Sequence, residues 1–275
     1  MVDDRDDRAD NLLWPKAVTV TNEGGISPYL FVCEHASHFI PDRFDKLGLN
    51  EHELTAHIAW DPGAVEVARQ MGDSLNACVI EAELSRLLID CNRSLEAPDL
   101  IPETSEATLI PGNQALSSSE RAERIELSHA PFHACIEQII TKRSAQGQPS
   151  WIVTIHSFTP AYLGTQRPWE IGIIHDEDDR IARPLIEALK QDKSINVGVN
   201  QPYSPADRVY YTLERHARPR NAPCVMVELR NDEIASAAQQ KDWADRLATI
   251  FQKLEPSIAS QDEESSSHDP TGQKG

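Results

Sequence analysis

Two kinds of segment alternate along the chain, and they differ in how their apolar residues are spaced. Short runs of apolar, often β-branched residues predict strands, whereas longer runs with apolar residues at helical spacing predict helices. Asp61 followed by Pro62 is a typical helix start, because the carboxylate can cap free N–H groups and proline is tolerated in the first turn. The predicted strands are 29–33, 77–82, 151–155, 169–175 and 225–229, and the predicted helices are 61–75, 118–143, 179–191 and 241–254.

The alternation of strands and helices determines the predicted fold class. Strands separated by helices need crossover connections, which place them in a mostly parallel sheet with helices on both faces. The sequence therefore predicts an α/β protein with a three-layer α/β/α architecture and a mixed, mostly parallel central sheet. Since no internal repeat or linker divides the chain, we expect a single domain over residues 21–257, a flexible acidic segment over 1–20 and a disordered, acidic and serine-rich tail over 258–275.

Charge and cysteine usage narrow the possible partners and the compartment. Asp and Glu number 44 against 26 Lys and Arg, which gives a formal net charge of −18 and disfavours nucleic acid and anionic membranes as partners. The apolar runs are much shorter than the roughly 20 residues of a membrane-spanning helix. The acidic first residues lack the apolar core of a secretory signal. Because the five cysteines show no paired spacing, we expect free thiols and a cytoplasmic protein.

Polar residues that can bind a metal follow two predicted strands. His35 follows 29–33, His156 follows 151–155, and Asp61 opens a predicted helix that faces the same edge of the sheet. In sheets of this kind ligands bind at the carboxyl ends of the strands. Two imidazoles and one carboxylate with an open coordination position are typical of catalytic zinc, so we predict one Zn²⁺ held by His35, Asp61 and His156. Glu34 is an alternative carboxylate ligand, which spacing alone does not rank against Asp61.

Other polar residues predict groups that handle protons and bind substrate. Glu228, near the end of strand 225–229, is the expected general base. An ion pair with Arg230 on the same strand face is its alternative role. Arg93 and Arg230 are expected to bind a substrate carboxylate, since an anionic substrate of so acidic a protein needs local guanidinium groups. Tyr203 lies in a predicted turn at the border of a pocket.

Seven short motifs follow one another along the chain. They are EHAS at 34–37, WDPGA at 60–64, DCNR at 90–93, HAPFH at 129–133, HSF at 156–158, PYS at 202–204 and VELRND at 227–232. In these motifs and in their order the chain resembles the N-formylglutamate amidohydrolase family. The resemblance implies a three-layer, phosphorylase/hydrolase-like fold similar to zinc carboxypeptidases, with His35, Asp61 and His156 as metal ligands and Glu228 as general base. It also implies that Ser37, His133 and Tyr203 lie near the substrate.

The expected function is hydrolysis of the amide of an N-formyl or other N-acyl amino acid, N-formylglutamate first among them, by a water molecule that the metal activates. One alternative is a thiol amidase in which His35 activates Cys33. A second alternative is a non-catalytic protein of the same fold that binds an anionic ligand. We expect a small anionic substrate as the partner, and the sequence does not indicate an oligomeric state.

Overall fold

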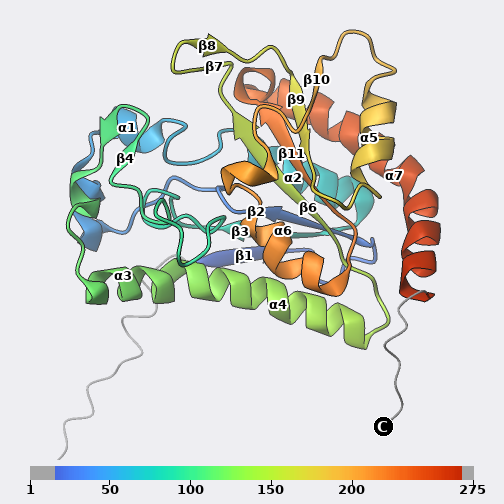
Figure 1. Ribbon diagram of the computed structural model, residues 1–275, viewed down its shortest axis with the longest axis horizontal. Coiled ribbons are helices and arrows are strands. Elements are labelled where there is room, and N and C mark those ends of the chain that lie inside the picture. The colour runs from blue at the N-terminus through green and yellow to red at the C-terminus, as the bar shows by residue number, and fades with distance from the viewer. Residues whose placement is uncertain (1–15, 268–275) are drawn as a thin grey trace, which may run out of the picture.

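A computed structural model describes residues 16–267 of the chain, with side chains to residue 264, and has a mixed seven-stranded sheet at its centre (Figure 1). The strand order is β1-β3-β2-β6-β11-β9-β10. Neighbouring strands are parallel except at β1–β3 and β11–β9. The strands are β1 (Val18–Thr21), β2 (Tyr29–Cys33), β3 (Cys78–Ala82), β6 (Trp151–Phe158), β9 (Ile171–Ile174), β10 (Val197–Val199) and β11 (Cys224–Arg230).

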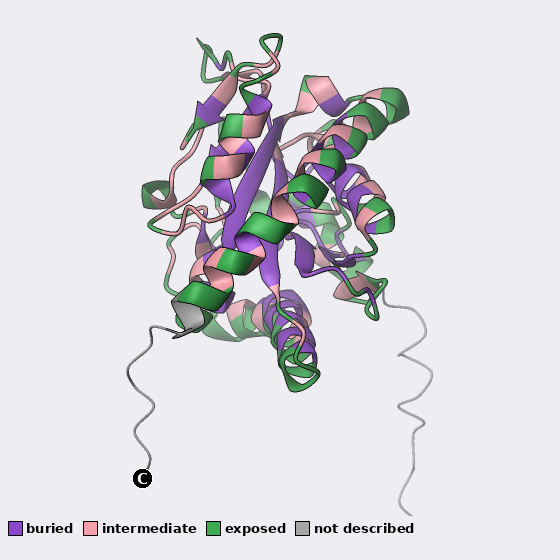
Figure 2. Ribbon diagram, turned by 90° about the vertical axis from the view of Figure 1, so that its right-hand side faces the viewer, coloured by how far each residue is buried: buried purple, intermediate pink, exposed green. Residues whose placement is uncertain are grey.

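Helices cover both faces of the sheet, because alternate residues of each central strand face opposite apolar layers. Tyr29, Phe31 and Cys33 of β2 pack in a core cluster with side chains of α2, α5 and α7. Leu30 and Val32 pack in a second cluster with α4 and α6. Figure 2 shows the buried strands enclosed between these helices. The helices are α2 (Ala64–Leu75), α4 (Ala130–Ala145), α5 (Ala182–Leu189), α6 (Tyr211–His216) and α7 (Ala237–Ser267).

The connections between the main strands and helices carry the remaining short elements. A third apolar cluster, which includes Leu47, Leu87 and Ile110, holds residues 36–63 together with residues 83–117. The short helical elements are η2 (Asp42–Gly48), α1 (Glu51–Thr55), η3 (Pro111–Asn113), α3 (Ser118–Arg124), the π-turn η4 (Ile125–His129), η5 (Pro205–Asp207), η6 (Arg218–Arg220) and η7 (Asn231–Ile234). Two hairpins complete the chain, β4 (Thr104–Ser105) with β5 (Thr108–Leu109) and β7 (Ala161–Tyr162) with β8 (Thr165–Gln166).

The predicted fold class is confirmed, and every predicted strand and helix overlaps an observed one. The predicted helix 118–143 is interrupted by the π-turn η4, and strands β1 and β10 were not predicted. Two of the described elements extend into the terminal segments of the predicted domain division. β1 lies partly within the predicted flexible segment because it pairs with β3, and α7 continues into the predicted tail because Ile258 is buried in the core. Residues 1–15 and 268–275, the rest of both terminal segments, lie outside the described residues.

No helix within residues 16–267 combines the length and the apolar character that crossing a membrane requires.

Gly63 fixes the turn between Asp61 and α2. Its φ is +82°, and a Cβ atom there would lie 2.5 Å from the backbone oxygen of Ile234. We expect Gly63→Ala to lower the free energy of unfolding by about 2–4 kcal/mol, because left-handed strain of ~1–2 kcal/mol adds to a backbone clash. Gly147→Ala is the matched control, since Gly147 has φ +68° with nothing within 4 Å of such a Cβ atom. Urea unfolding of both variants should show the larger loss for Gly63, and equal losses would contradict the clash.

Candidate metal and active site

Three elements bring the candidate residues to the carboxyl edge of the sheet. His35 follows β2 by two residues, and His156 lies near the end of β6. Asp61 precedes α2, and its backbone N–H donates to the carbonyl of His35 at 2.9 Å, which ties the helix entrance to the end of β2. Glu228 of β11 is the parallel partner of His156 in the strand register. His35, Asp61, His156 and Glu228 therefore converge, because the parallel strands end together.

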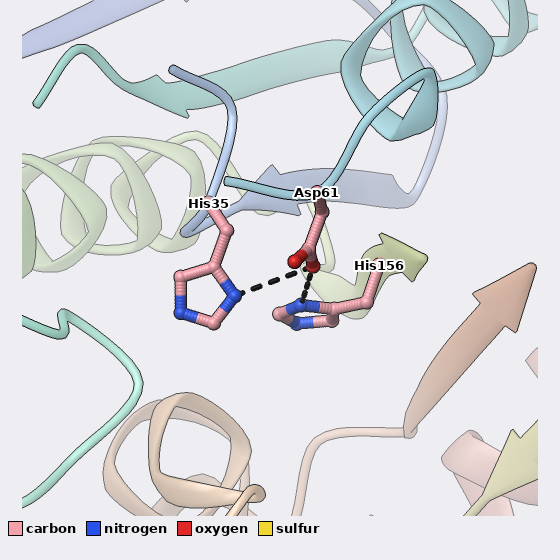
Figure 3. Close-up of side chains that lie close together, drawn as sticks. All are labelled: His35, Asp61 and His156. Atoms are coloured by element: carbon pink, nitrogen blue, oxygen red, sulfur yellow. Dashed lines mark hydrogen bonds and ion pairs between the residues drawn. The ribbon is translucent and has the colours of Figure 1, made fainter. Parts of the chain in front are cut away.

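Asp61 is the centre of the cluster (Figure 3). Its Oδ2 lies 2.8 Å from Nδ1 of His156 and 3.3 Å from Nδ1 of His35. One ligand atom from each of the three residues lies within 4.8 Å of the other two, and all three side chains are buried. Two imidazole nitrogens and a carboxylate oxygen at this separation are suited to a single divalent metal ion.

A second carboxylate holds the other nitrogen of each imidazole. Nε2 of His35 lies 2.7 Å from Oδ1 of Asp90, and Nε2 of His156 lies 3.2 Å from Oε2 of Glu34. Metal-ligating histidines usually have such an outer carboxylate, which fixes the ring and leaves the inner nitrogen free to ligate. The geometry thus suits Asp61 as the candidate carboxylate ligand and gives Glu34 the outer position behind His156.

The charges of the cluster shift the pKa values of its members. Burial alone would raise the pKa of Asp61, but the two histidines and Arg86 hold it below the ordinary value. The pKa of Asp90 is likewise held well below its usual range, against burial, by His35, Arg93 and Arg86. The pKa of His156 is raised well above normal, against burial, by Glu34 and Asp61. The site therefore keeps the carboxylates of Asp61 and Asp90 charged in spite of burial.

Glu228 faces a cavity of about 540 Å³ that also contains His35, Asp61 and His156. Its side chain is buried, and within the described part of the chain its Oε2 has no hydrogen-bond partner. The pKa of Glu228 is raised to about 7, because burial and Asp61 raise it more than the two histidines and Arg86 lower it. A buried carboxyl group with a free oxygen, beside a candidate metal site, is suited to transferring a proton.

Three predicted substrate residues do not line this cavity. Arg230 forms ion pairs with Glu170, Asp232 and Glu233, rather than the alternative pair with Glu228. The hydroxyl of Ser37 accepts a hydrogen bond from the Phe39 backbone. His133 is buried behind the loop that carries Arg93. Arg93 and Tyr203 do line the cavity, and the substrate contacts of Arg230, Ser37 and His133 stay predictions.

Three functional candidates were missed from the sequence. Arg86 bridges Asp61 and Asp90, with its two terminal nitrogens each 3.2 Å from a carboxylate oxygen. Asp90 was part of a quoted motif, but only its neighbour Arg93 received a role. Arg167 lies in the cavity wall and follows a two-residue strand, where no hydrophobic pattern marks it. A sequence signal for Arg86 and Asp90 did exist, because the two residues are four positions apart and Asp90 is the first residue of the DCNR motif.

The thiol alternative is not supported, because Cys33 is buried in the core cluster that packs against α2 and α7. Burial and the neighbouring carboxylate of Glu34 raise the pKa of the Cys33 thiol well above its usual value. The nucleophilic thiolate is therefore disfavoured at a position that does not line the cavity.

His129 of η4 and His133 of α4 hydrogen-bond the backbone of the loop that carries Asp90 and Arg93. Nε2 of His129 donates to the carbonyl of Arg93 at 2.9 Å, and Nε2 of His133 donates to the carbonyl of Cys91 at 2.9 Å. Burial lowers the pKa of His133 to about 2, so its Nδ1 accepts a hydrogen bond from His216, at 2.9 Å. These bonds fix the loop whose Asp90 orients His35.

Fold and site together define an α/β protein with a candidate two-histidine, one-carboxylate metal centre at the carboxyl edge of its sheet. The model of the N-formylglutamate amidohydrolase family matches residues 27–235, which is most of the chain. The chain belongs to this family, as its seven ordered motifs predicted.

Comparison with solved structures agrees with this assignment. A crystal structure of a gene product from Agrobacterium tumefaciens is similar with a TM-score of 0.87 and 42% sequence identity, covering 89% of this chain and 97% of that one. The structure of N-formylglutamate amidohydrolase from Ralstonia eutropha JMP134 gives a TM-score of 0.63 at 18% identity, covering 90% and 100% of the two chains. At that identity the second match supports the fold alone. No curated protein matches the chain.

His133→Phe tests whether the loop is held from behind. The phenyl ring keeps most of the volume but leaves the Cys91 carbonyl and the His216 N–H buried without partners. We expect the free energy of unfolding to fall by about 2–4 kcal/mol, at ~1–3 kcal/mol for each unsatisfied group. We also expect zinc to bind roughly 10-fold more weakly, because Asp90 loses its fixed position.

The control for this variant is His52→Phe, at an exposed position of α1, which should change neither quantity. Denaturant unfolding and a zinc titration against a chelator measure both. Parental zinc affinity in folded His133→Phe protein would show that the loop does not depend on this histidine.

Proposed function

We propose that the protein is a metal-dependent amidohydrolase that cleaves the amide of an N-formyl or other N-acyl amino acid, with N-formyl-L-glutamate as the first substrate to test. The observation that supports this best is the shared cavity, in which the unpartnered carboxyl of Glu228 faces the His35–Asp61–His156 cluster. Family membership supports the reaction class. Proteins that share a fold can differ in substrate and reaction, so the proposal depends mainly on the residues of the site.

Each residue of the site has a proposed role in metal binding or proton transfer. His35, Asp61 and His156 would hold the metal, for which we propose zinc, while Asp90 and Glu34 fix the two imidazole rings. When bound, zinc supplies Lewis-acid chemistry, polarising the amide carbonyl and making water more acidic. Glu228 takes the proton from the attacking water and returns it to the departing amide nitrogen.

Cationic side chains of the cavity wall would bind the acyl amino acid. Arg93 lines the cavity, with its Nε 2.9 Å from Asp99 and its Nη1 3.8 Å from Asp90. Arg86 is shared between Asp61 and Asp90 and lies where negative charge would develop on the amide oxygen. The products would be formate, or another small acid, and the free amino acid.

Metal analysis tests the proposed ligands. Purified without chelator, the parent protein should contain about one equivalent of zinc by elemental analysis. His156→Ala should contain little, because it removes one of three ligands. The matched variant His38→Ala, at an exposed histidine that contacts Trp60, should keep the parental content. Stoichiometric zinc in His156→Ala would refute the ligand assignment, and its absence from the parent would refute the metalloenzyme proposal.

Glu228→Gln tests the proton transfer. The amide keeps the size of the side chain but is not a base, so turnover of the best N-acyl amino acid should fall by roughly 10²–10⁴-fold. Zinc content should be unchanged, because Glu228 is not a proposed ligand. Glu187→Gln, an exposed position on α5, serves as the control and should retain the parental rate. A steady-state rate assay of Glu228→Gln with near-parental turnover per folded, zinc-loaded molecule would exclude the residue from the mechanism.

A further inference from the structure

Arg167 is a buried cation of the cavity wall that is held by aromatic rings. The residue is 8% exposed, and its guanidinium lies 4.6 Å from the ring centre of Tyr162 and 4.9 Å from that of Tyr203. Phe158 contributes a third ring at 5.8 Å. Its Nη1 donates to the hydroxyl of Thr159 at 3.3 Å, and the guanidinium also hydrogen-bonds the hydroxyl of Tyr203, which leaves the rest of its five donors unassigned. Across the described residues, no carboxylate forms an ion pair with Arg167.

The other two arginines of the cavity differ from Arg167 in this respect. Arg86 is neutralised by Asp61 and Asp90, and Arg93 by Asp99 and Asp90. Carboxylates elsewhere in the wall also have partners: Glu106 pairs with His57, and Asp207 accepts hydrogen bonds from Ser204. Arg167 is therefore the cavity arginine whose charge the described protein groups leave unbalanced.

Burial of an unbalanced guanidinium is costly, and the rings offset only part of the cost. A guanidinium has five N–H donors in a planar fork, and stacking on aromatic faces leaves its edge available for hydrogen bonds in the plane. Such an edge matches the two oxygens of a carboxylate. Acidic groups in the same cavity, among them Glu228 and Asp207, disfavour an anion of higher charge such as phosphate.

We propose that Arg167, framed by Tyr162 and Tyr203, is the receptor for a carboxylate group of the ligand that occupies this cavity. The inference rests on the proposed function for the reaction that the ligand undergoes, but not for the binding of its carboxylate group. Gly172 helps to build the receptor, because a Cβ atom there would lie 2.1 Å from the Gln201 carbonyl, and its absence lets the segment leading to Tyr203 pack on β9. Arg167 would thus share the role that the sequence assigned to Arg93 and Arg230.

Binding of glutarate, a dicarboxylate that cannot be hydrolysed, tests the receptor without an activity assay. Isothermal titration of the zinc-loaded parent should give saturable binding. Arg167→Met should weaken it by about 10–100-fold, the equivalent of one or two charge-assisted hydrogen bonds. Arg167→Lys should also weaken it at least several-fold, since it keeps the charge but loses the fork. The control Arg183→Gln, an exposed arginine of α5, should bind as the parent does.

The melting temperature without glutarate separates a ligand receptor from a structural arginine. Removal of an unpaired buried charge should leave the melting temperature of Arg167→Met unchanged or raise it. A structural role predicts a fall of several degrees, and that result would overturn the proposal. Parental glutarate affinity in Arg167→Met, no glutarate binding to the parent, or inorganic phosphate binding as tightly as glutarate would each overturn it as well.

This outcome can be distinguished from failure of the proposed reaction. If no N-acyl amino acid is hydrolysed but glutarate binding still requires Arg167, the receptor stands and the reaction is wrong. If N-acyl amino acids are hydrolysed and KM is the same in the parent and in Arg167→Met, the reaction stands and the receptor is wrong.

Discussion

The carboxylate of Asp61, buried between two imidazole rings, is the interaction on which the rest of this site depends. A buried carboxylate is costly unless it is paired, and here two histidines and Arg86 surround it. The same contacts constrain the fold, because they join the entrance of α2 to the ends of β2 and β6. Bringing a metal ion to this cluster would place a positive charge where negative charge is already concentrated.

Outer carboxylates extend this arrangement away from the metal position. Asp90 and Glu34 each hold the far nitrogen of one histidine, and Arg86 links Asp90 back to Asp61. His129 and His133 in turn hold the loop that carries Asp90, from the π-turn and the following helix. The long helix on the far face of the sheet therefore contributes to the site without touching the cavity. A continuous α-helix would present different residues to this loop, so the π-helical segment η4 helps to place His129 and His133 against it.

Hydrophobic spacing was enough to predict the sheet, the main helices and the residues that strand ends bring together. His35, His156 and Glu228 could be found because each lies at the end of an apolar run, and parallel strands end at one edge. The same logic did not predict the ion pairs of Arg230 with Glu170, Asp232 and Glu233, since alternation along a strand indicates a face but not which acidic side chains meet that face. Arg167 could not be found, because its surroundings combine residues 158–162 with Tyr203, which only the tertiary structure brings next to them.

The candidate metal ligands and Glu228 lie on different elements from Arg167 and its aromatic neighbours, and this separation has a consequence for specificity. The candidate metal ligands and Glu228 lie on or next to central strands, where packing on both faces leaves little freedom to move. Arg167, Tyr162 and Tyr203 instead lie on a hairpin and connections at the edge of the sheet, where sequence can change at little cost to the core. A fold built in this way can keep its reaction chemistry while the ligand changes. A buried arginine that has no carboxylate partner among the described residues has a cost in stability, and a ligand carboxylate is the group that would offset it.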